Sequence, residues 1–343
     1  MKGVLLILIS SFGFLPMACA QTLNKEVNSI DTLAEKVLVY QLDNGAWPKQ
    51  LMDKSVVNYE LALDAQLLRT IKATTIEHAT IDNKATTREI DILLEAFQQT
   101  KNQRYLLSAK RGIAYLLAAQ YENGGWPQYF PDKHLYRAQI TYNDNAMVNV
   151  LLILLKVALQ HDVEVLPLVE FQKGAATAVQ KGVDCILKTQ VKQHGQLSIW
   201  AAQYDPENLV PAQARAFEPI SLSTGESVGI IRFLMKVPNP TPDIINAIQA
   251  GVNWFEMHKQ VGFKYGRDAS GKNSLIPMEG AFYWGRFYDI ATNRIIFGDR
   301  DGSVKYNFDE LSLERRNGYV WYGDFASKLL ESEYPKWLKK IKA

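Results

Sequence analysis

Two short polar segments contain the residue types that bind a hard cation. Thr80–Ile90 reads TIDNKATTREI and places Asp82 and Asn83 before a helix that is predicted to begin at residue 86. Thr141–Asn149 reads TYNDNAMVN and places Asp144 before another predicted helix. Carboxylate and amide oxygens are the ligands that calcium prefers, typically about six to eight of them. If the two helices occupy the same layer of the fold, both junctions open onto one end, and the acidic side chains converge there.

The same junctions have a purely structural interpretation. Aspartate and asparagine often cap the first free N–H groups of a helix. Thr86 and Glu89 also have the spacing of a capping box. The spacing alone favours capping over metal binding and leaves both interpretations open.

Two further segments concentrate arginine and aromatic residues. The loop at 211–227 contains Arg215, and an arginine in such a loop ordinarily forms a surface ion pair. The segment 286–302 contains Arg286, Tyr288 and Arg300, and more arginines and aromatics follow it. Arginine recognises carboxylates with two parallel hydrogen bonds, and aromatic rings stack on sugars. This mixture suits an acidic polysaccharide, although an ordinary hydrated loop has a similar composition.

Several other chemistries lack support in the sequence. The five histidines do not have the His-Glu-x-x-His spacing of a zinc hydrolase, and neither a Gly-x-Ser-x-Gly elbow nor a phosphate-binding loop is present. The 38 basic and 36 acidic residues nearly balance, so the global charge does not favour nucleic acid or a membrane surface as a partner. Cys185 is flanked by apolar residues and is predicted to be a small buried core residue.

Helical periodicity dominates the first 260 residues and predicts an all-α protein. Predicted helices span 28–41, 59–73, 86–99, 103–120, 144–161, 170–190, 223–236 and 241–257. The stretch 262–322 has no helical period and is expected to contain function or short extra strands.

A weak internal repeat suggests how these helices are arranged. Residues 41–50 and 120–130 share Gln-x-x-Asn-Gly-x-Trp-Pro at the end of a helix, and 193–205 is a fainter relative. Repeated helical hairpins with long loops close naturally into an (α/α) toroid. Trp47 and Trp126 are predicted either to anchor these loops or to stack on a sugar.

The N-terminal segment 1–20 has the features of an export signal. A short basic start precedes an apolar core, and Ala-Cys-Ala then offers a cleavage site before Gln21. The apolar run is too short for a membrane span. We expect a secreted or periplasmic protein whose mature chain, 21–343, is one catalytic domain. A lipid anchor at Cys19 is the less favoured alternative, because the two residues before it fit a lipid-attachment signal poorly.

Taken together, the ordered motifs resemble the family 10 pectate lyases from about residue 27 to 335. The matching segments read NGGWPQYFP, ITYNDNAMVNVL, WAAQYDPENLVPAQARAFEPISLSTGESVGI and RFYDIATNRIIFGDRDG followed by ERRNGYVWYG. The resemblance implies an (α/α) toroid that cleaves de-esterified polygalacturonate by calcium-assisted β-elimination. We expect a monomer.

The resemblance also assigns roles to individual residues. It implies that Asp82, Asn83 and Asp144 hold calcium, that Arg215 is the catalytic base, and that Arg300 contacts substrate carboxylates. Substrate-binding candidates named from their own positions are Lys84, Arg286, Tyr288 and Trp126.

An arginine base is chemically demanding, because guanidinium normally stays protonated. A nearby metal ion and other cations are expected to lower the pKa of Arg215. Alternatives to a lyase are a non-catalytic protein that binds acidic polysaccharide and a toroid glycosidase with two catalytic carboxylates. A terpene cyclase is disfavoured, since no Asp-rich acid motif is present.

Overall fold

All eight predicted helices are present in the computed structural model, which describes residues 30–160 and 166–342. They are α1 (Thr32–Val39), α2 (Ala65–Ala73), α3 (Thr87–Thr100), α4 (Gln103–Ala118), α5 (Ala146–Ala158), α6 (Val169–Thr189), α7 (Thr224–Leu234) and α8 (Pro242–Met257). Two more, α9 (Leu313–Gly318) and α10 (Tyr334–Lys342), lie near the C-terminus. The predicted all-α class is confirmed.

Two helices begin later than predicted because an aspartate caps each of them. Asp31 accepts a hydrogen bond from the Ala34 N–H at the start of α1. Asp64 accepts two such bonds at the start of α2. The apolar period continues before both caps, so periodicity alone placed the helix starts too early.

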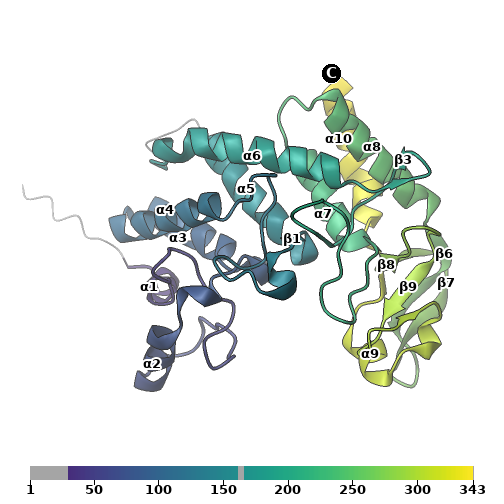
Figure 1. Ribbon diagram of the computed structural model, residues 1–343, viewed down its shortest axis with the longest axis horizontal. Coiled ribbons are helices and arrows are strands. Elements are labelled where there is room, and N and C mark those ends of the chain that lie inside the picture. Colours follow the sequence, from purple (N-terminus) through teal and green to yellow (C-terminus); the bar gives the residue numbers. More distant parts are fainter. Residues whose placement is uncertain (1–29, 161–165, 343) are drawn as a thin grey trace, which may run out of the picture.

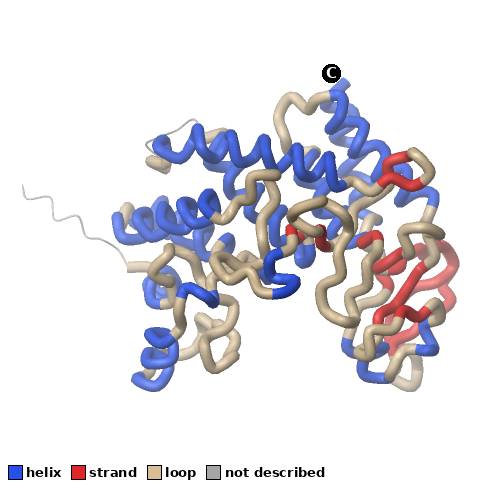
Figure 2. Tube along the Cα trace, viewed as in Figure 1, coloured by secondary structure: helices blue, strands red, loops and turns tan. Residues whose placement is uncertain are grey.

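Three helical hairpins form the body of the molecule (Figures 1 and 2). α3 packs on α4, α5 packs on α6, and α7 packs on α8. The first helices of successive hairpins also touch, since α3 contacts α5 and α5 contacts α7. Their facing sides are apolar and belong to one large buried cluster. This arrangement is the predicted toroid of paired helices, with the starts of α3, α5 and α7 as equivalent positions.

A repeated glutamine links each hairpin unit to the next one. The side-chain amide of each glutamine donates to a carbonyl oxygen in its own loop and to a second carbonyl oxygen on a following helix. The second contacts run from Gln41 to Ser108 of α4, from Gln120 to Ala178 of α6 and from Gln190 to Ala247 of α8, with lengths of 2.9, 2.9 and 3.0 Å. The predicted third repeat is therefore real, although Gln190 lies before the segment that the sequence pattern suggested.

The repeated tryptophans anchor the loops that end these helices. Trp47, Trp126 and Trp200 are fully buried, and their indole N–H groups donate to backbone carbonyls at 2.8, 2.7 and 2.8 Å. Each ring packs where a glycine leaves room, and an added Cβ would meet ring carbons at 2.9 to 3.5 Å. These glycines are Gly112, Gly182 and Gly251.

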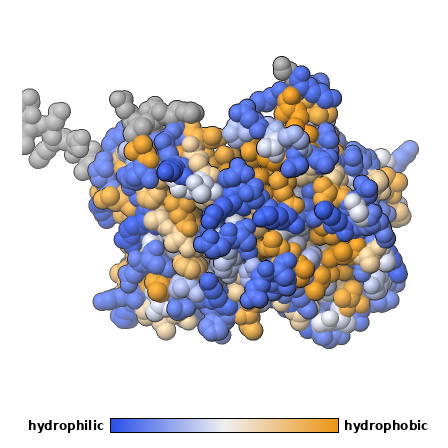
Figure 3. Space-filling view, turned by 45° about the horizontal axis from the view of Figure 1, so that its top comes forward, coloured by the Kyte–Doolittle hydropathy of each residue, from blue (hydrophilic) through white to orange (hydrophobic). Residues whose placement is uncertain are grey.

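Strands are longer after residue 260 than the sequence suggested. β6 (Gln260–Arg267) and β7 (Asn273–Gly285) form an antiparallel hairpin, with β11 (Tyr322–Gly323) on the other edge of β7. Most residues of β6 and the first half of β7 are exposed or half-buried on both faces, so they lack the alternation that marks a half-buried strand. Hydrophobic side chains are interspersed over this side of the molecule (Figure 3).

The remaining strands are short. A four-stranded sheet has the order β10-β9-β8-β5, with β5 next to α7 in sequence. Its strands are β5 (Leu222–Ser223), β8 (Phe287–Tyr288), β9 (Ile295–Gly298) and β10 (Val304–Lys305). Two further pairs are β1 (Ile140–Thr141) with β4 (Gln203–Tyr204), and β2 (Lys192–Gln193) with β3 (Gln196–Leu197).

The structure tests the prediction for Cys185 but not the prediction of an N-terminal export signal. Cys185 is fully buried, as predicted, and burial raises the pKa of its thiol to about 11. The proposed signal segment 1–20 lies outside the described residues. Among the helices that the structure describes, none is long and apolar enough to cross a membrane.

Candidate active site

The first acidic junction is a tight turn, η2 (Asp82–Lys84), which directly precedes α3. Asp82 is buried, and one of its carboxylate oxygens pairs with the Lys49 ammonium. Its other oxygen, Oδ1, is buried and has no hydrogen-bond partner among the described residues. Asn83 and Lys84 both have left-handed backbone angles and exposed side chains. The turn thus buries the Asp82 side chain and exposes those of Asn83 and Lys84.

The second acidic junction, η4 (Asn143–Asn145), precedes α5 and packs directly against η2. Asp144 and Asn145 have φ values of 52° and 59°, a left-handed pair like the one in η2. The Asp144 carboxylate reaches solvent and accepts one hydrogen bond, from Asn143 Nδ2 at 3.2 Å. The predicted meeting of the two junctions is therefore found.

Helix capping does not explain these residues. Asn145 is the N-cap residue of α5 but makes no side-chain capping bond, and Asp144 makes none either. Thr86 begins α3 and instead donates to the Thr80 carbonyl at 2.8 Å. The predicted capping box is wrong, since Glu89 is buried and pairs with Arg88. The acidic side chains are not needed by the helices that follow them.

A third carboxylate, Glu226, was missed by the sequence analysis. It lies in the first turn of α7, the equivalent position in the third hairpin unit, and is 3% exposed. Ser223 donates to one of its oxygens, and Arg286 Nη2 lies 3.2 Å from the other. The segment STGES carried a usable signal, because it opens the helix that follows the third tryptophan loop.

The two neighbouring carboxylates affect the ionisation of Asp144. Burial, followed by the charges of Glu226 and Asp82, raises the pKa of Asp144 above its usual range, while Arg286 and Arg215 act in the opposite direction. Negative charges close to a carboxylate disfavour its ionised form and favour a bound cation or proton beside it. Burial and neighbouring negative charges therefore both oppose ionisation of Asp144 when no cation is bound beside it.

Arg215 forms a close ion pair with Glu218. Arg215 Nε donates to Glu218 Oε2 at 2.9 Å, the backbone N–H donates to the same oxygen at 3.2 Å, and Nη2 donates to Oε1. This pairing raises the pKa of Arg215 above its already high usual value. Glu218 thus acts in the opposite direction to the expected effect of a metal ion and other cations on the pKa of Arg215.

A cavity of about 350 Å³ brings several predicted residues together. Its lining comes from η4, from the Arg215 loop and from the segments around β7 and α9. The lining residues are Asn143, Asp144, Arg215, Asn273, Arg286, Asn317, Gly318, Tyr319 and Val320. An acid and two arginines thus face one space that is open to solvent.

Arg300 lies beside this cavity rather than in its wall. Its Nε and Nη2 donate to the Glu314 carboxylate at 3.0 and 2.8 Å. Its guanidinium lies 4.5 Å from the centre of the Phe217 ring, and that of Arg215 lies 4.9 Å from the same centre. Phe217 therefore holds the two predicted functional arginines close together.

Two substrate-binding candidates do not fit that role. Trp126 and Tyr288 are 0% and 1% exposed, so neither ring has a face for a sugar. The indole of Trp126 donates to the Leu116 carbonyl, and the Tyr288 hydroxyl accepts from the Gly285 N–H at 3.0 Å. Of the two roles considered for Trp126, the loop anchor is the one that the structure supports.

Replacing Trp126 by alanine is therefore expected to affect folding rather than substrate affinity. Loss of a buried tryptophan typically lowers the free energy of unfolding by about 3–5 kcal/mol. Urea denaturation measures this change, and titration with an oligogalacturonide measures affinity in the folded fraction. A stable variant with weakened oligogalacturonide binding would contradict the anchor role.

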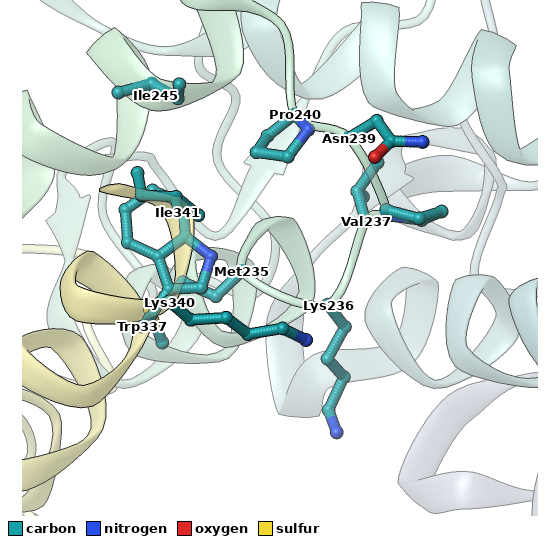
Figure 4. A pocket seen from close by; sticks show the side chains of 10 residues that line it. Met235, Lys236, Val237, Asn239, Pro240, Ile245, Trp337, Lys340 and Ile341 are labelled. Carbon is teal, nitrogen blue, oxygen red and sulfur yellow. The ribbon is translucent and has the colours of Figure 1, made fainter. Parts of the chain in front are cut away.

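Another cavity lies away from these residues, between α10 and the loop from α7 to α8 (Figure 4). Its volume is about 700 Å³, and Trp337 and Ile341 of α10 form one side of it. Its charged lining residues are Lys236 and Lys340. Without an acid or any predicted site residue, it does not compete with the smaller cavity as a reaction centre.

The acidic junctions supply some, but not all, of the oxygen ligands that a calcium ion needs. The buried Asp82 Oδ1 has no partner, and Asp144 is accessible beside two other carboxylates. Within residues 30–160 and 166–342, however, no three His, Cys, Asp or Glu side chains are grouped closely enough to hold a metal ion by themselves. A calcium ion here would need further oxygen ligands from substrate or water.

Comparison with known proteins agrees with this geometry. The family model for pectic acid lyase matches residues 41–330. A family 10 polysaccharide lyase from Cellvibrio cellulosa shares 35% sequence identity over 91% of this chain and 94% of that one, with a TM-score of 0.80. A substituted variant of the Cellvibrio cellulosa enzyme, in complex with trigalacturonic acid, shares 36% identity over 89% and 92% of the two chains, with a TM-score of 0.79. No match was found among curated proteins.

Paired helices, with a cavity lined by one carboxylate and two arginines, agree with the helical polysaccharide lyases that this chain matches. The extent of the family match and the identity to a solved member make the assignment specific. The chain belongs to the family 10 pectate lyases.

Proposed function

We propose that this pectate lyase cleaves α-1,4-polygalacturonate by calcium-assisted β-elimination. The observation that carries the proposal is the shared cavity of Asp144, Arg215 and Arg286, next to the unpartnered Asp82 oxygen. The complex of the related enzyme with trigalacturonic acid supports a polygalacturonate substrate. A negatively charged sugar acid matches the two arginines, and the acids suit a bridging cation.

The reaction removes the proton at C5 of a uronate and breaks the bond between C4 and its oxygen. The electron pair of the C5–H bond forms the C4–C5 double bond, and the departing oxygen acquires a proton. A calcium ion held by Asp82, Asn83 and Asp144 would withdraw electron density from the uronate carboxylate. Arg286, which is largely buried against Glu226, would stabilise the charge that develops on that carboxylate.

Arg215 is the proposed proton acceptor at C5. It lines the cavity, and roughly half of its side chain is exposed, so a substrate can reach its guanidinium. In its neutral form one nitrogen can take the proton. Because Glu218 raises the pKa of Arg215, this neutral form is scarce at neutral pH and increases as the pH rises. We therefore expect turnover to increase into the alkaline range.

Replacing Glu218 by glutamine tests this ionisation directly. The change removes the negative charge that raises the pKa of Arg215, while an amide oxygen can still accept a hydrogen bond. The rise of turnover with pH should move to lower pH, because the neutral fraction of Arg215 increases. The measurement is the pH dependence of kcat. A profile that stays in place, or moves to higher pH, would show that deprotonation of Arg215 does not control the rate.

We further propose that the protein is exported and is cleaved near Ala20–Gln21. The basic start, the apolar core and the small residues before Gln21 support this proposal. Protein secreted from an exporting bacterial host should have an N-terminus at or near Gln21, as measured by N-terminal sequencing. A lipid-modified N-terminus at Cys19 would instead establish anchoring, and an intact chain in the cytoplasm would contradict export.

The mass of the products tests the reaction class. Elimination divides an oligogalacturonate without adding water, so the two product masses sum to that of the substrate. Hydrolysis by a toroid glycosidase adds one water molecule to that sum. A non-catalytic binding protein leaves the substrate intact. Mass spectrometry of a digested oligogalacturonate therefore separates all three functions.

A further inference from the structure

A second groove begins beside the acidic junctions and lies between α3 and α5. Its volume is about 360 Å³. One wall comes from η2 and α3 and the other from α5. The lining residues are Lys84, Thr87, Arg88, Asp91, Asn149, Leu152, Ile153 and Lys156. Since α3 and α5 both start at the candidate metal junctions and pack together, the groove leads away from the reaction site.

The charges lining this groove are mostly positive. Three cationic side chains, Lys84, Arg88 and Lys156, face one acid, Asp91. Lys156 pairs with Asp91 at 3.1 Å, and Arg88 pairs with the buried Glu89. Within the described residues, the Lys84 ammonium has neither a hydrogen bond nor an ion pair. A free cation therefore stands at the end of the groove that is nearest to Asp82.

A neutral donor in the same groove also lacks a partner. The side-chain amide nitrogen of Asn149 is buried and makes no hydrogen bond to any described residue. Buried polar groups nearly always have a partner, so this N–H group calls for water or a ligand oxygen. Leu152 and Ile153 supply an apolar surface beside it. Cations, an amide donor and an apolar wall together suit a sugar acid.

We propose that this groove is a distal subsite for uronate units of the same polygalacturonate chain whose reacting unit lies at Asp144. The inference rests on the proposed function, because it takes its ligand from that function. Polygalacturonate has one carboxylate on every sugar, so units beyond the reacting one still need cationic partners. From Asn149 to Lys156 the groove follows α5 for two turns, or about 10 Å. Lys84 contacts a uronate carboxylate at the end of the subsite nearest to Asp82, and Lys156 contacts another at the opposite end.

Oligomers of different length distinguish this subsite from the reaction cavity. In the full-length protein carrying Arg215→Lys, which slows cleavage, calorimetry would measure the Kd values of trigalacturonate and hexagalacturonate. Adding Lys156→Glu should weaken hexagalacturonate binding about threefold to tenfold, near the upper end of the effect of an exposed charge. Trigalacturonate should bind unchanged, because Lys156 lies about three helical turns from the acidic junction η4. Asn149→Leu should have the same length-dependent effect without any change of charge.

Lys181→Glu provides the matched control. Lys181 is a half-exposed lysine on α6 that pairs with Glu122 at 3.5 Å, and it lines none of the cavities described above. Lys181→Glu changes the net charge of the protein by the same amount as Lys156→Glu. It should leave both Kd values unchanged. Equal weakening by Lys156→Glu and Lys181→Glu, or equal weakening of both oligomers, would overturn the subsite. Failure of both oligomers to bind before either change would instead contradict the proposed function.

Discussion

Arg215→Lys is expected to reduce turnover on polygalacturonate about a hundredfold or more. The change keeps a positive charge but replaces a planar fork by a single ammonium, which removes the nitrogen at the position of the proposed base. It also removes the two side-chain hydrogen bonds that the Arg215 guanidinium donates to Glu218. Substrate affinity should change much less, because Arg286 and the acidic junctions remain. Steady-state kinetics on polygalacturonate gives turnover, and oligogalacturonide titration gives affinity.

Arg300→Ala is the appropriate comparison for this variant. Arg300 shares the Phe217 ring with Arg215 but is exposed and pairs with Glu314. Its loss should weaken affinity as well as turnover, in contrast to Arg215→Lys. Near wild-type turnover in Arg215→Lys would reassign the C5 proton to another group and leave Arg215 as the ion-pair partner of Glu218.

Asp144→Ala is expected to remove most activity at low calcium while the protein stays folded. Within the described part of the chain, Asp144 caps no helix and accepts a single side-chain hydrogen bond, so its removal has little structural cost. Loss of even an outer partner of a metal ligand weakens metal affinity about tenfold to a hundredfold, and a direct ligand should matter at least as much. Activity measured across a calcium titration gives this shift.

Asp144→Asn adds a readout that is independent of activity. The pKa of Asp144 is raised in the folded protein, so its ionised form opposes folding once the pH exceeds the ordinary carboxyl range. The amide should therefore raise the Tm of metal-free protein at neutral pH. A bound ion stabilises the folded state by mass action, so calcium should raise the Tm of the unsubstituted protein much more than that of Asp144→Asn. Equal calcium responses would remove Asp144 from the metal site.

Periodicity predicted the helical body of this protein well because its helices are amphipathic. The apolar period predicted all eight helices. The meeting of Asp82 with Asp144 was predicted because the helices that follow them start in the same layer of the fold. The repeat also predicted buried loop anchors such as Trp126, but sequence spacing could not exclude a sugar-stacking role. Burial against a neighbouring helix decides that question, and it is a tertiary property.

Other features could not be obtained from local sequence. Glu226 lies at the start of α7 in the third hairpin unit, and the sequence repeat is too faint there to mark that position. The long hairpin of β6 and β7 has no alternating pattern, because much of it is exposed on both faces. The pairing of Arg215 with Glu218 depends on a loop conformation that composition does not encode. It is also the feature that most changes the expected pH dependence.

The most direct test of calcium-assisted elimination is ultraviolet absorbance during incubation with polygalacturonate, with and without a chelator. Elimination creates a C4–C5 double bond conjugated to the carboxylate, which absorbs in the ultraviolet, whereas hydrolysis creates none. We expect absorbance to rise with calcium present, to stop when the chelator is added, and to resume when excess calcium is restored. Chain cleavage without a rise in absorbance would contradict elimination, and an undiminished rise in the chelator would contradict the role of calcium.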